Sequence, residues 1–480
     1  MSTLKKLAGQ TAIYGLSSIL GRLLNYLLVP IYTYPGNYAP AEYGVISEFY
    51  AYVAFLVVFL MFGMETTFFR FISKSEDKEK TFNQAFSIVL VTNLFFILTV
   101  LFFSQDIANL LSYPDMSNYV IWFGFILVFD ATSSLFLAKL RYLEQPKKFA
   151  IIQLSSIAVN IVFNLFFIFI LLDNHRDFGI GFVFLANLLS SLIKPILLYK
   201  EMSKFRFVMD KIMAKTMIIF AIPLLIGSFA GIINETLDRI LLKKLEMNKG
   251  LEYAQTQVGI YSANYKLSIL ITLVIQAFRY AAEPFFFAQE KNKDKDKIYS
   301  KVMTYFVIVV SLIFLTISLN LELFKWFVPN PDYWEGLKVV PILLLANVFL
   351  GIYYNQSIWY KLANKTKFGA YIALVGATIT ITLNLILIPL IGYMGAAWTT
   401  LICYATMTFL SHYLGQKHYP IKYNLRKVGL FLISAIVLVL IGNWLTFESF
   451  WLTFSIHSFL ILIYLGIVHI VENPLKNYNR

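Results

Sequence analysis

Long apolar stretches recur along the whole chain, and short polar segments separate them. Each stretch has about twenty or more residues, the length that a helix needs to cross the roughly 30 Å hydrocarbon core of a bilayer. The pattern predicts an all-α, polytopic membrane protein with about fourteen transmembrane helices. We expect these helices at residues 8–33, 43–71, 81–104, 118–140, 149–172, 178–200, 214–242, 257–285, 299–320, 337–360, 368–390, 394–415, 427–445 and 449–471.

Basic residues are distributed unevenly between alternate polar segments. With the N-terminus in the cytoplasm, and with residues at helix ends counted in the adjoining loop, 28 of the 40 Lys and Arg residues lie on the cytoplasmic side and six on the outer side. Because Lys and Arg are retained in the cytoplasm, both termini are predicted to be cytoplasmic. The net charge of +13 then requires no nucleic-acid partner, since basic loops face anionic headgroups.

Composition agrees with a membrane protein and offers little for enzymatic chemistry. Hydrophobic residues make up 59% and charged residues 14% of the chain, whereas soluble domains have about 25% charged residues. Cys403 is the single cysteine, which excludes an internal disulfide, and the five histidines do not have metal-ligand spacing. No Gly-Lys-Ser/Thr phosphate loop is present. We therefore expect no metal, no cofactor and no enzymatic activity.

The two halves of the sequence resemble each other at an offset of about 215 to 220 residues. Residues 43–50, at the start of the second predicted helix, match residues 258–265, at the start of the eighth. The charged loops 75–80 and 290–295 follow these two helices. Further matches in the same order pair Pro114 with Pro331, Lys148 with Lys367 and Asn164 with Asn384.

A repeat that spans six helices gives both copies the same orientation in the membrane. The sequence thus predicts an N-terminal lobe at 1–213, a C-terminal lobe at 214–420, and a segment 421–480 with two further helices. Pseudo-symmetric repeats that move against each other around a central site are typical of transporters. A duplicated scaffold without transport is the alternative interpretation.

Six basic residues remain within the predicted helices: Arg22, Arg70, Lys194, Arg239, Lys266 and Arg279. A basic residue at a helix centre costs about 2.5–3.5 kcal/mol on insertion scales. Arg70, Lys194 and Arg279 lie near cytoplasmic ends, from which long side chains reach the interface. Arg22 has no intrahelical partner, so we expect it to line a water-filled cavity. Because guanidinium binds phosphate through two parallel hydrogen bonds, such a cavity favours a phosphate-bearing anion over a cationic drug.

Acidic residues accompany several of these cations: Glu235 with Arg239 and Arg279 with Glu283 (both four apart), and Glu65 with Arg70 (five apart). Residues four apart share a helix face. Asp130 and Asp238 also lie within predicted helices. These pairs are interpreted either as contacts that lock helices together or as the lining of a cavity.

The seventh predicted helix contains Pro223, followed by Gly227 and Gly231 on one face. Small residues four apart favour close helix packing, and proline within a helix favours a bend. We expect close packing at the two glycines, and residues 223–231 are also a candidate hinge.

Short motifs extend this interpretation to a family. They are the segments 12–22, 30–33, 43–45, 63–70, 237–239 and 259–261. With them, nearly the whole chain resembles the O-antigen and capsule-unit flippases, which form the polysaccharide-transporter branch of the multidrug/oligosaccharidyl-lipid/polysaccharide (MATE-like) exporter superfamily.

The resemblance implies two lobes around a cavity in which basic residues meet a pyrophosphate; Arg22, Arg70 and Arg239 are the candidates here. It implies alternating-access transport of a polyprenyl-pyrophosphate-linked oligosaccharide, for example a lipopolysaccharide O-antigen unit, to the outer leaflet of the bacterial inner membrane. The polysaccharide synthesis machinery is a possible partner. Further candidates for the cavity or for ion coupling are Glu65, Asp130, Glu235, Asp238, Lys266, Arg279 and Glu283.

Two other functions stay open. An ion-coupled multidrug exporter of the same fold requires a cavity dominated by acidic and aromatic residues. A membrane polysaccharide polymerase or ligase needs a sizeable outer loop to hold its chemistry, whereas the predicted outer loops have at most about fifteen residues.

Overall fold

The computed structural model describes residues 20–472, apart from residues 22, 291, 364 and 446. Within this part of the chain the regular secondary structure is helical, without strands. The chain divides into two compact units, Met1–Ile240 and Leu241–Arg480, and each is described here by itself. The all-α fold predicted from the sequence is therefore confirmed.

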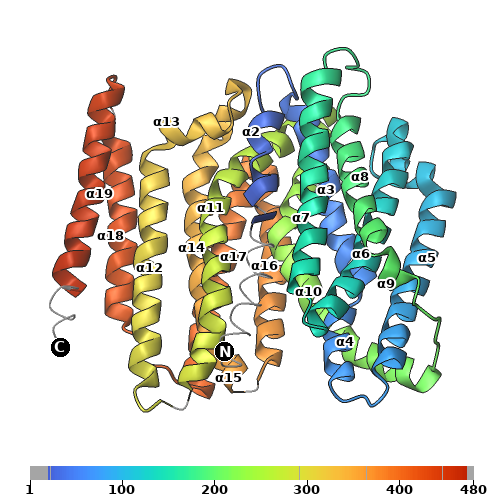
Figure 1. Cartoon of the computed structure of the whole chain (residues 1–480). Coiled ribbons are helices and arrows are strands. Elements are labelled where there is room, and N and C mark those ends of the chain that lie inside the picture. The colour runs from blue at the N-terminus through green and yellow to red at the C-terminus, as the bar shows by residue number, and fades with distance from the viewer. Residues whose placement is uncertain (1–19, 22, 291, 364, 446, 473–480) are drawn as a thin grey trace. The chain divides into compact units, whose positions relative to one another are not determined.

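The first unit has a series of helices, of which Figure 1 labels the α-helices. They are α2 (Val29–Tyr32), α3 (Pro40–Met61), α4 (Met64–Ile72), α5 (Lys78–Leu110), the 3-10 helix η1 (Pro114–Met116), α6 (Ser117–Tyr142), α7 (Pro146–Phe166), the π-helical turn η2 (Phe167–Leu171), α8 (Gly181–Leu197), α9 (Tyr199–Met202) and α10 (Lys211–Glu246), whose last turns belong to the second unit.

The second unit continues with η3 (Met247–Lys249), α11 (Leu251–Gln289), α12 (Lys295–Leu319), α13 (Leu321–Phe324), η4 (Lys325–Phe327), η5 (Pro331–Val339), α14 (Val340–Gln356), α15 (Ile358–Leu362), α16 (Lys367–Ile391), α17 (Tyr393–His418), α18 (Leu425–Trp444) and α19 (Phe450–Glu472).

Eleven segments in the described part of the chain are long and apolar enough to cross a membrane. Two shorter apolar helices, Leu23–Tyr32 and Gly181–Leu197, coincide with the first and sixth predicted helices, and α17 coincides with the twelfth. Large apolar side chains on α5 are exposed, for instance Phe95 at 75% and Phe102 at 79%, as expected for a helix surrounded by lipid. The chain is thus a multi-pass membrane protein, and the count of about fourteen crossings stays a prediction.

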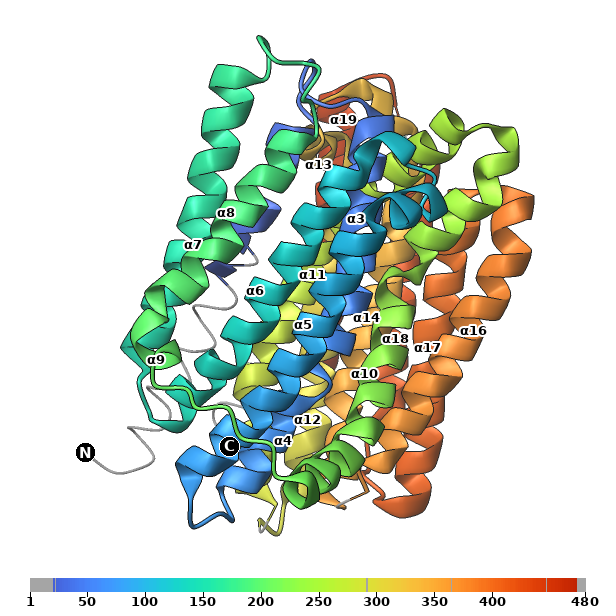
Figure 2. The ribbon, with the colours of Figure 1, turned by 90° about the vertical axis from the view of Figure 1, so that its right-hand side faces the viewer.

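The first unit is built around α6, which packs against α3, α5 and α8, while α7 packs against α8. Figure 2 shows α5 beside α6 and α7 beside α8. The core between α5 and α6 is aromatic: the Phe136 ring lies 5.1 Å from that of Phe82 and 4.7 Å from that of Phe86, both edge to face. Such ring pairs add to the stabilisation from burial.

A break separates α3 from α4, although the sequence predicts one helix at 43–71. Phe62 and Gly63 both adopt left-handed backbone conformations, with φ of 50° and 63°. A Cβ atom added at Gly63 would lie 3.1 Å from Leu224 Cβ and 3.3 Å from the Ala221 carbonyl oxygen on α10. Gly63 therefore permits both the left-handed turn and the close approach of α10.

In the second unit, α14 packs against α11, α12 and α17. The last two helices are attached through α12, because α12 packs against both α18 and α19. Figure 1 shows α12, α18 and α19 side by side. Their shared core includes Phe314, Phe431 and Tyr464, all buried.

Helix α10 extends further than the seventh predicted helix. It runs as one helix through Pro223 to Glu246, so that Lys243, predicted to lie in an outer loop, lies in its last turn. A Cβ at Gly231 would meet no described atom within 4 Å, and the close packing expected at the two glycines stays a prediction. The first compact unit ends within α10, at Ile240, and the lobe boundary at 213 stays a prediction. The predicted hinge at 223–231 stays a prediction.

Glycines with positive φ stand just before the last long helix of each predicted six-helix lobe. Gly179 (φ 43°) precedes α8, and Gly392 (φ 58°) precedes α17. The similar positions agree with the repeat seen in the sequence, and the assignment of two symmetric lobes stays a prediction.

Candidate functional site

Arg22, the first candidate for the pyrophosphate, lies outside the described residues. The second, Arg70, lies in the last turn of α4 and is exposed. Its guanidinium stacks on the Phe220 ring of α10, 4.4 Å from the ring centroid. A cation over an aromatic face is stabilised by about 0.5–2 kcal/mol, and the guanidinium edge keeps its hydrogen-bond donors. Arg70 is thus oriented by α10 without losing its donors.

Glu65, five residues before Arg70, pairs with a more distant residue. Its carboxylate lies 2.5 Å from the Arg141 guanidinium of α6. The side chains are 38% and 32% exposed respectively, so the pair ties α4 to α6 at a partly accessible position. Glu65 therefore forms a contact between two helices. Arg70 takes no part in this ion pair.

Arg239, the third pyrophosphate candidate, is buried near the C-terminal end of α10. Its guanidinium lies 3.0 Å from the Asp238 carboxylate and donates to the Glu235 carbonyl oxygen at 2.8 Å. The side chains of Arg239 and Asp238 are only 11% and 5% exposed, while Glu235 is exposed. The carboxylate held by Arg239 is therefore that of its neighbour Asp238, and Glu235 contributes its backbone.

Asp130 and Lys194 form an ion pair inside the first unit. The Lys194 ammonium of α8 donates to the Asp130 carboxylate of α6 at 2.9 Å. Their side chains are 18% and 33% exposed for Lys194 and Asp130 respectively. Each charge thus compensates the cost of burying the other in a membrane segment, and the sequence had not paired them.

The second unit holds the remaining candidates. Arg279 on α11 is exposed and stacks on the Tyr354 ring, with its guanidinium carbon 4.1 Å from the ring centroid. Glu283 lies 2.8 Å from the Lys361 ammonium of α15. Both Arg279 and Glu283 line a pocket of ≈ 20 Å³. The structure thus brings Arg279 and Glu283 to one pocket, and Lys266, on the same helix, is half-buried.

Glu48, which is not among the candidates predicted from the sequence, is the acidic residue of α3 with the least exposure, 1%. The Tyr113 hydroxyl donates to one of its carboxylate oxygens at 2.5 Å, and the Tyr52 hydroxyl donates to the other at 3.0 Å. The available signal was the same as for Asp130, an acidic residue within an apolar stretch.

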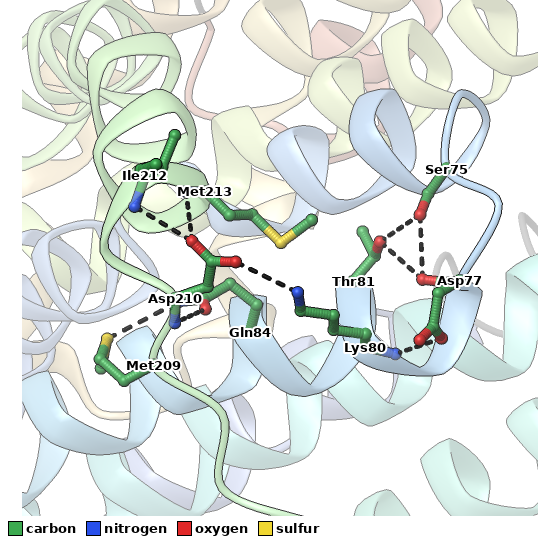
Figure 3. A network of polar contacts seen from close by, with 9 residues as sticks. All are labelled: Ser75, Asp77, Lys80, Thr81, Gln84, Met209, Asp210, Ile212 and Met213. Carbon is green, nitrogen blue, oxygen red and sulfur yellow. Dashed lines mark hydrogen bonds and ion pairs between the residues drawn. The ribbon is translucent and has the colours of Figure 1, made fainter.

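A polar network between the first turns of α5 and the segment before α10 holds the start of α10 in place (Figure 3). Asp77 caps α5 by accepting from the Lys80 backbone amide at 2.9 Å, and the Lys80 ammonium lies 3.1 Å from Asp210. Asp210 in turn accepts from the backbone amides of Ile212 and Met213, both at 3.1 Å, so it caps α10. The first turn of α10 is thereby held at the first turn of α5.

The segment before α10 is fixed by α5 as well. The Gln84 side chain accepts from the Asp210 backbone amide at 2.7 Å, and the Ser87 hydroxyl accepts from the Val208 amide at 3.0 Å. The amide of Met213 and the Lys80 ammonium both donate to the Asp210 carboxylate and lower the pKa of Asp210 below its ordinary value. The carboxylate is therefore the form that caps the helix.

Among the described residues, no group of three His, Cys, Asp or Glu side chains is arranged to hold a metal ion. The geometry therefore consists of paired charges on helices and of two arginines, Arg70 and Arg279, that are exposed and stacked on rings. Exposed guanidinium groups held on rings suit the recognition of an anion.

Comparison with known families decides the family. The family described as "Polysaccharide biosynthesis protein" matches residues 7–288, more than half of the chain. The chain belongs to this family. No match is found among curated protein sequences.

Solved structures share the fold of this polysaccharide biosynthesis family member. The lipid II flippase MurJ, in an inward closed conformation, superposes with a TM-score of 0.74 at 14% identity, covering 97% of this chain and 99% of that protein. An inward-facing multidrug resistance MATE family transporter of the MOP superfamily gives 0.62 at 12% identity, over 90% and 99%. A MATE protein in a straight conformation gives 0.60 at 14% identity, over 89% and 96%. The resemblance stated from the sequence is therefore confirmed at the level of family and fold.

Proposed function

We propose that this protein is a flippase that moves a polyprenyl-pyrophosphate-linked oligosaccharide from the inner to the outer leaflet of a bacterial inner membrane. The observation that carries the proposal is membership in a polysaccharide biosynthesis family together with a fold shared with a lipid II flippase. Alternating access is the mechanism that this fold class supports. Both termini are then cytoplasmic, and the chain is a transporter rather than an enzyme.

Arg70 is the described residue best suited to meet the pyrophosphate. It is exposed and oriented by Phe220, and its neighbour Glu65 is engaged by Arg141. The Arg239 guanidinium, in contrast, is buried and already holds the Asp238 carboxylate. Binding an anion at Arg239 would require this pair to open, so we assign Arg239 to the packing of α10 and Arg70 to the substrate.

The net charge of the substrate bears on the energy source for transport. With the inside of the cell negative, moving two net negative charges outward gains about 4.6 kcal/mol per 100 mV, from about 2.3 kcal/mol per charge. A substrate that leaves with its charges uncompensated could therefore be driven by the membrane potential. The acidic residues Asp130, Glu235 and Asp238 are the alternatives if a cation is coupled.

The proposal is tested in cells that lack the gene, by asking which leaflet holds the undecaprenyl-linked glycan. Loss of the gene is expected to leave the glycan in the cytoplasmic leaflet. The wild-type protein and Arg206→Gln should restore export, while Arg70→Gln should not. Arg206 is a matched control because it is an exposed arginine in the loop before α10. Protein levels in the membrane are measured for each variant.

Normal delivery to the outer leaflet in the deletion strain, without a redundant transporter, would contradict the proposal. The fold is also that of multidrug MATE transporters, which favours drug export as the second candidate. In that case overexpression should protect cells from cationic dyes, and the glycan should reach the outer leaflet with or without the protein.

A further inference from the structure

A large basic groove lies at one end of the second unit, and none of the candidate residues above lines it. It has a volume of ≈ 1010 Å³. Its walls come from the loop before α12, the first turns of α12 and α18, and the end of α19. The charged residues that line it are Lys293, Asp294, Asp296, Lys297, Lys301, Lys422, Arg426, Lys427 and Glu472. Six cations thus face three carboxylates.

The pairing of these charges leaves an excess of cations. The Lys427 ammonium lies 2.7 Å from the Glu472 carboxylate, which is 8% exposed. Lys297 pairs with Asp294 at 3.0 Å on the exposed rim. Within the described residues, four of the cations have no carboxylate partner: Lys293, Lys301, Lys422 and Arg426. All four are exposed, so their charges are available to a ligand.

Two helices point their N-terminal ends at this groove. α12 begins at Lys295 and α18 at Leu425, and residues of both first turns line the groove. The Asn424 side chain caps α18 through the Lys427 amide at 3.1 Å, and the Asn424 amide donates to the Ser300 hydroxyl at 3.0 Å. This bond holds the two helix starts together. Because the N-terminus of a helix carries a partial positive charge, the backbone adds to the attraction for an anion.

The groove also lies where a lipid headgroup would be. α12, α18 and α19 are all candidate membrane spans. Near the groove, their apolar side chains are exposed: Leu425 at 53%, Leu430 at 43% and Ile470 at 78%. A ligand with a negative headgroup and apolar chains would contact both surfaces at once, whereas a free anion would use only the groove. Loop charges predict this end to be cytoplasmic, the side on which basic pockets between membrane helices bind anionic headgroups.

We propose that this groove binds the phosphate headgroup of an anionic phospholipid, with the unpaired cations on the phosphate and the acyl chains against α18 and α19. The lining of the groove contains none of the proposed substrate residues, and the inference does not depend on the flippase function. Bound lipid would clamp the starts of α12 and α18 together and stabilise the attachment of the last two helices.

The test uses the full-length protein purified in an uncharged detergent. Native mass spectrometry counts the molecules of dioleoyl-phosphatidylglycerol bound during a titration, and dioleoyl-phosphatidylcholine serves as the neutral comparison. The wild-type protein should retain phosphatidylglycerol preferentially. The double variant Lys301→Gln/Arg426→Gln should bind it about 30-fold more weakly. Each cation near the surface contributes roughly 1 kcal/mol, which is about fivefold in affinity, and the variant removes two.

The matched control is Lys367→Gln/Lys417→Gln, which removes the same charge from two exposed lysines of the second unit that do not line the groove. It should bind phosphatidylglycerol like the wild type. A second groove variant, Lys293→Gln/Lys422→Gln, changes residues outside the helices only. It keeps the test informative if the variant Lys301→Gln/Arg426→Gln, which changes residues in α12 and α18, does not fold. Melting temperatures in phosphatidylcholine check that each variant is folded.

Equal affinity of the groove and control variants for phosphatidylglycerol would overturn the proposal. Sodium phosphate tests the other source of the same chemistry. If inorganic phosphate at matched concentration raises the melting temperature of the wild type as much as phosphatidylglycerol does, the ligand is a free anion and the lipid assignment is wrong. A stabilisation by phosphatidylglycerol alone, lost in both groove variants, supports it.

Discussion

The left-handed turn at Gly63 is a sensitive position, and we expect Gly63→Ala to destabilise the first unit. Two effects contribute. A non-glycine residue in the left-handed region costs about 1–2 kcal/mol. The added Cβ would lie 3.1 Å from Leu224 Cβ, closer than the roughly 3.5–4.0 Å at which carbon atoms attract. Such overpacking costs about 1–3 kcal/mol, so the total is about 2–5 kcal/mol.

Two other glycines of the same unit separate these effects. Gly36 has φ of 91°, and a Cβ there would meet no described atom within 4 Å, so Gly36→Ala carries the backbone penalty alone. Gly231 lies within α10 and is equally open, so Gly231→Ala carries neither penalty and should gain about 0.5–1 kcal/mol. The expected order of stability is therefore Gly231→Ala, wild type, Gly36→Ala, and Gly63→Ala last.

The assay is thermal unfolding of the purified protein in detergent, followed by the loss of monodisperse protein on size-exclusion chromatography. The export assay in cells gives a second reading, because a displaced α10 carries Phe220 away from Arg70. If Gly63→Ala had the same melting temperature as Gly231→Ala, both the backbone penalty and the close approach of α10 to the helix break would be wrong. If it had the same melting temperature as Gly36→Ala, the backbone penalty alone would explain the loss of stability.

Two further predictions concern charges. Asp130→Asn and Lys194→Gln should each destabilise the protein, and the double variant should lose less stability than the sum of the two, with a coupling energy of about 0.5–3 kcal/mol. The control is the exposed pair Asp173–Arg176, whose side chains are 85% and 48% exposed and whose coupling energy should be less than about 1 kcal/mol. If the coupling energy of Asp130–Lys194 were no larger than that of this control pair, the ion pair would not stabilise the membrane segments. Because the pKa of Asp210 is lowered in the folded protein, its stabilising effect is fully present above its ordinary value and is lost as the pH falls through the lowered one. The melting temperature of the wild type should therefore fall more steeply below pH 3.8 than that of Asp210→Asn, and parallel curves would exclude this capping interaction as a source of acid sensitivity.

The fold could be predicted from the sequence because the bilayer makes the pattern simple: long apolar runs must be helices whose backbone groups are satisfied internally. The break at Gly63 could not, because an isolated glycine in an apolar run looks the same whether it continues the helix or ends it. Its role depends on φ and on the approach of Leu224, and both are set by tertiary packing.

The charged residues show the same limit. The spacing of Glu65 and Arg70 suggested a local pair, yet Glu65 is held by Arg141, 76 residues away. Glu283 likewise pairs with Lys361 rather than following the four-residue spacing to Arg279. Local spacing identifies which residues share a helix face, but a partly buried charge takes whichever opposite charge the neighbouring helix presents. Candidate residues could therefore be found from the sequence, whereas their partners could not.

The position of α10 changes how the chain could be divided in experiments. The obvious cut from the sequence is the polar loop before this helix, at residue 213. A fragment that ends there would lack Leu224, which covers the break at Gly63, and Phe220, on which Arg70 stacks. The same loop is hydrogen-bonded to α5 through Gln84 and Ser87, so it is a poor place for an inserted tag. Half-proteins for co-expression should instead be divided after Glu246, so that the N-terminal half keeps the helix that completes it.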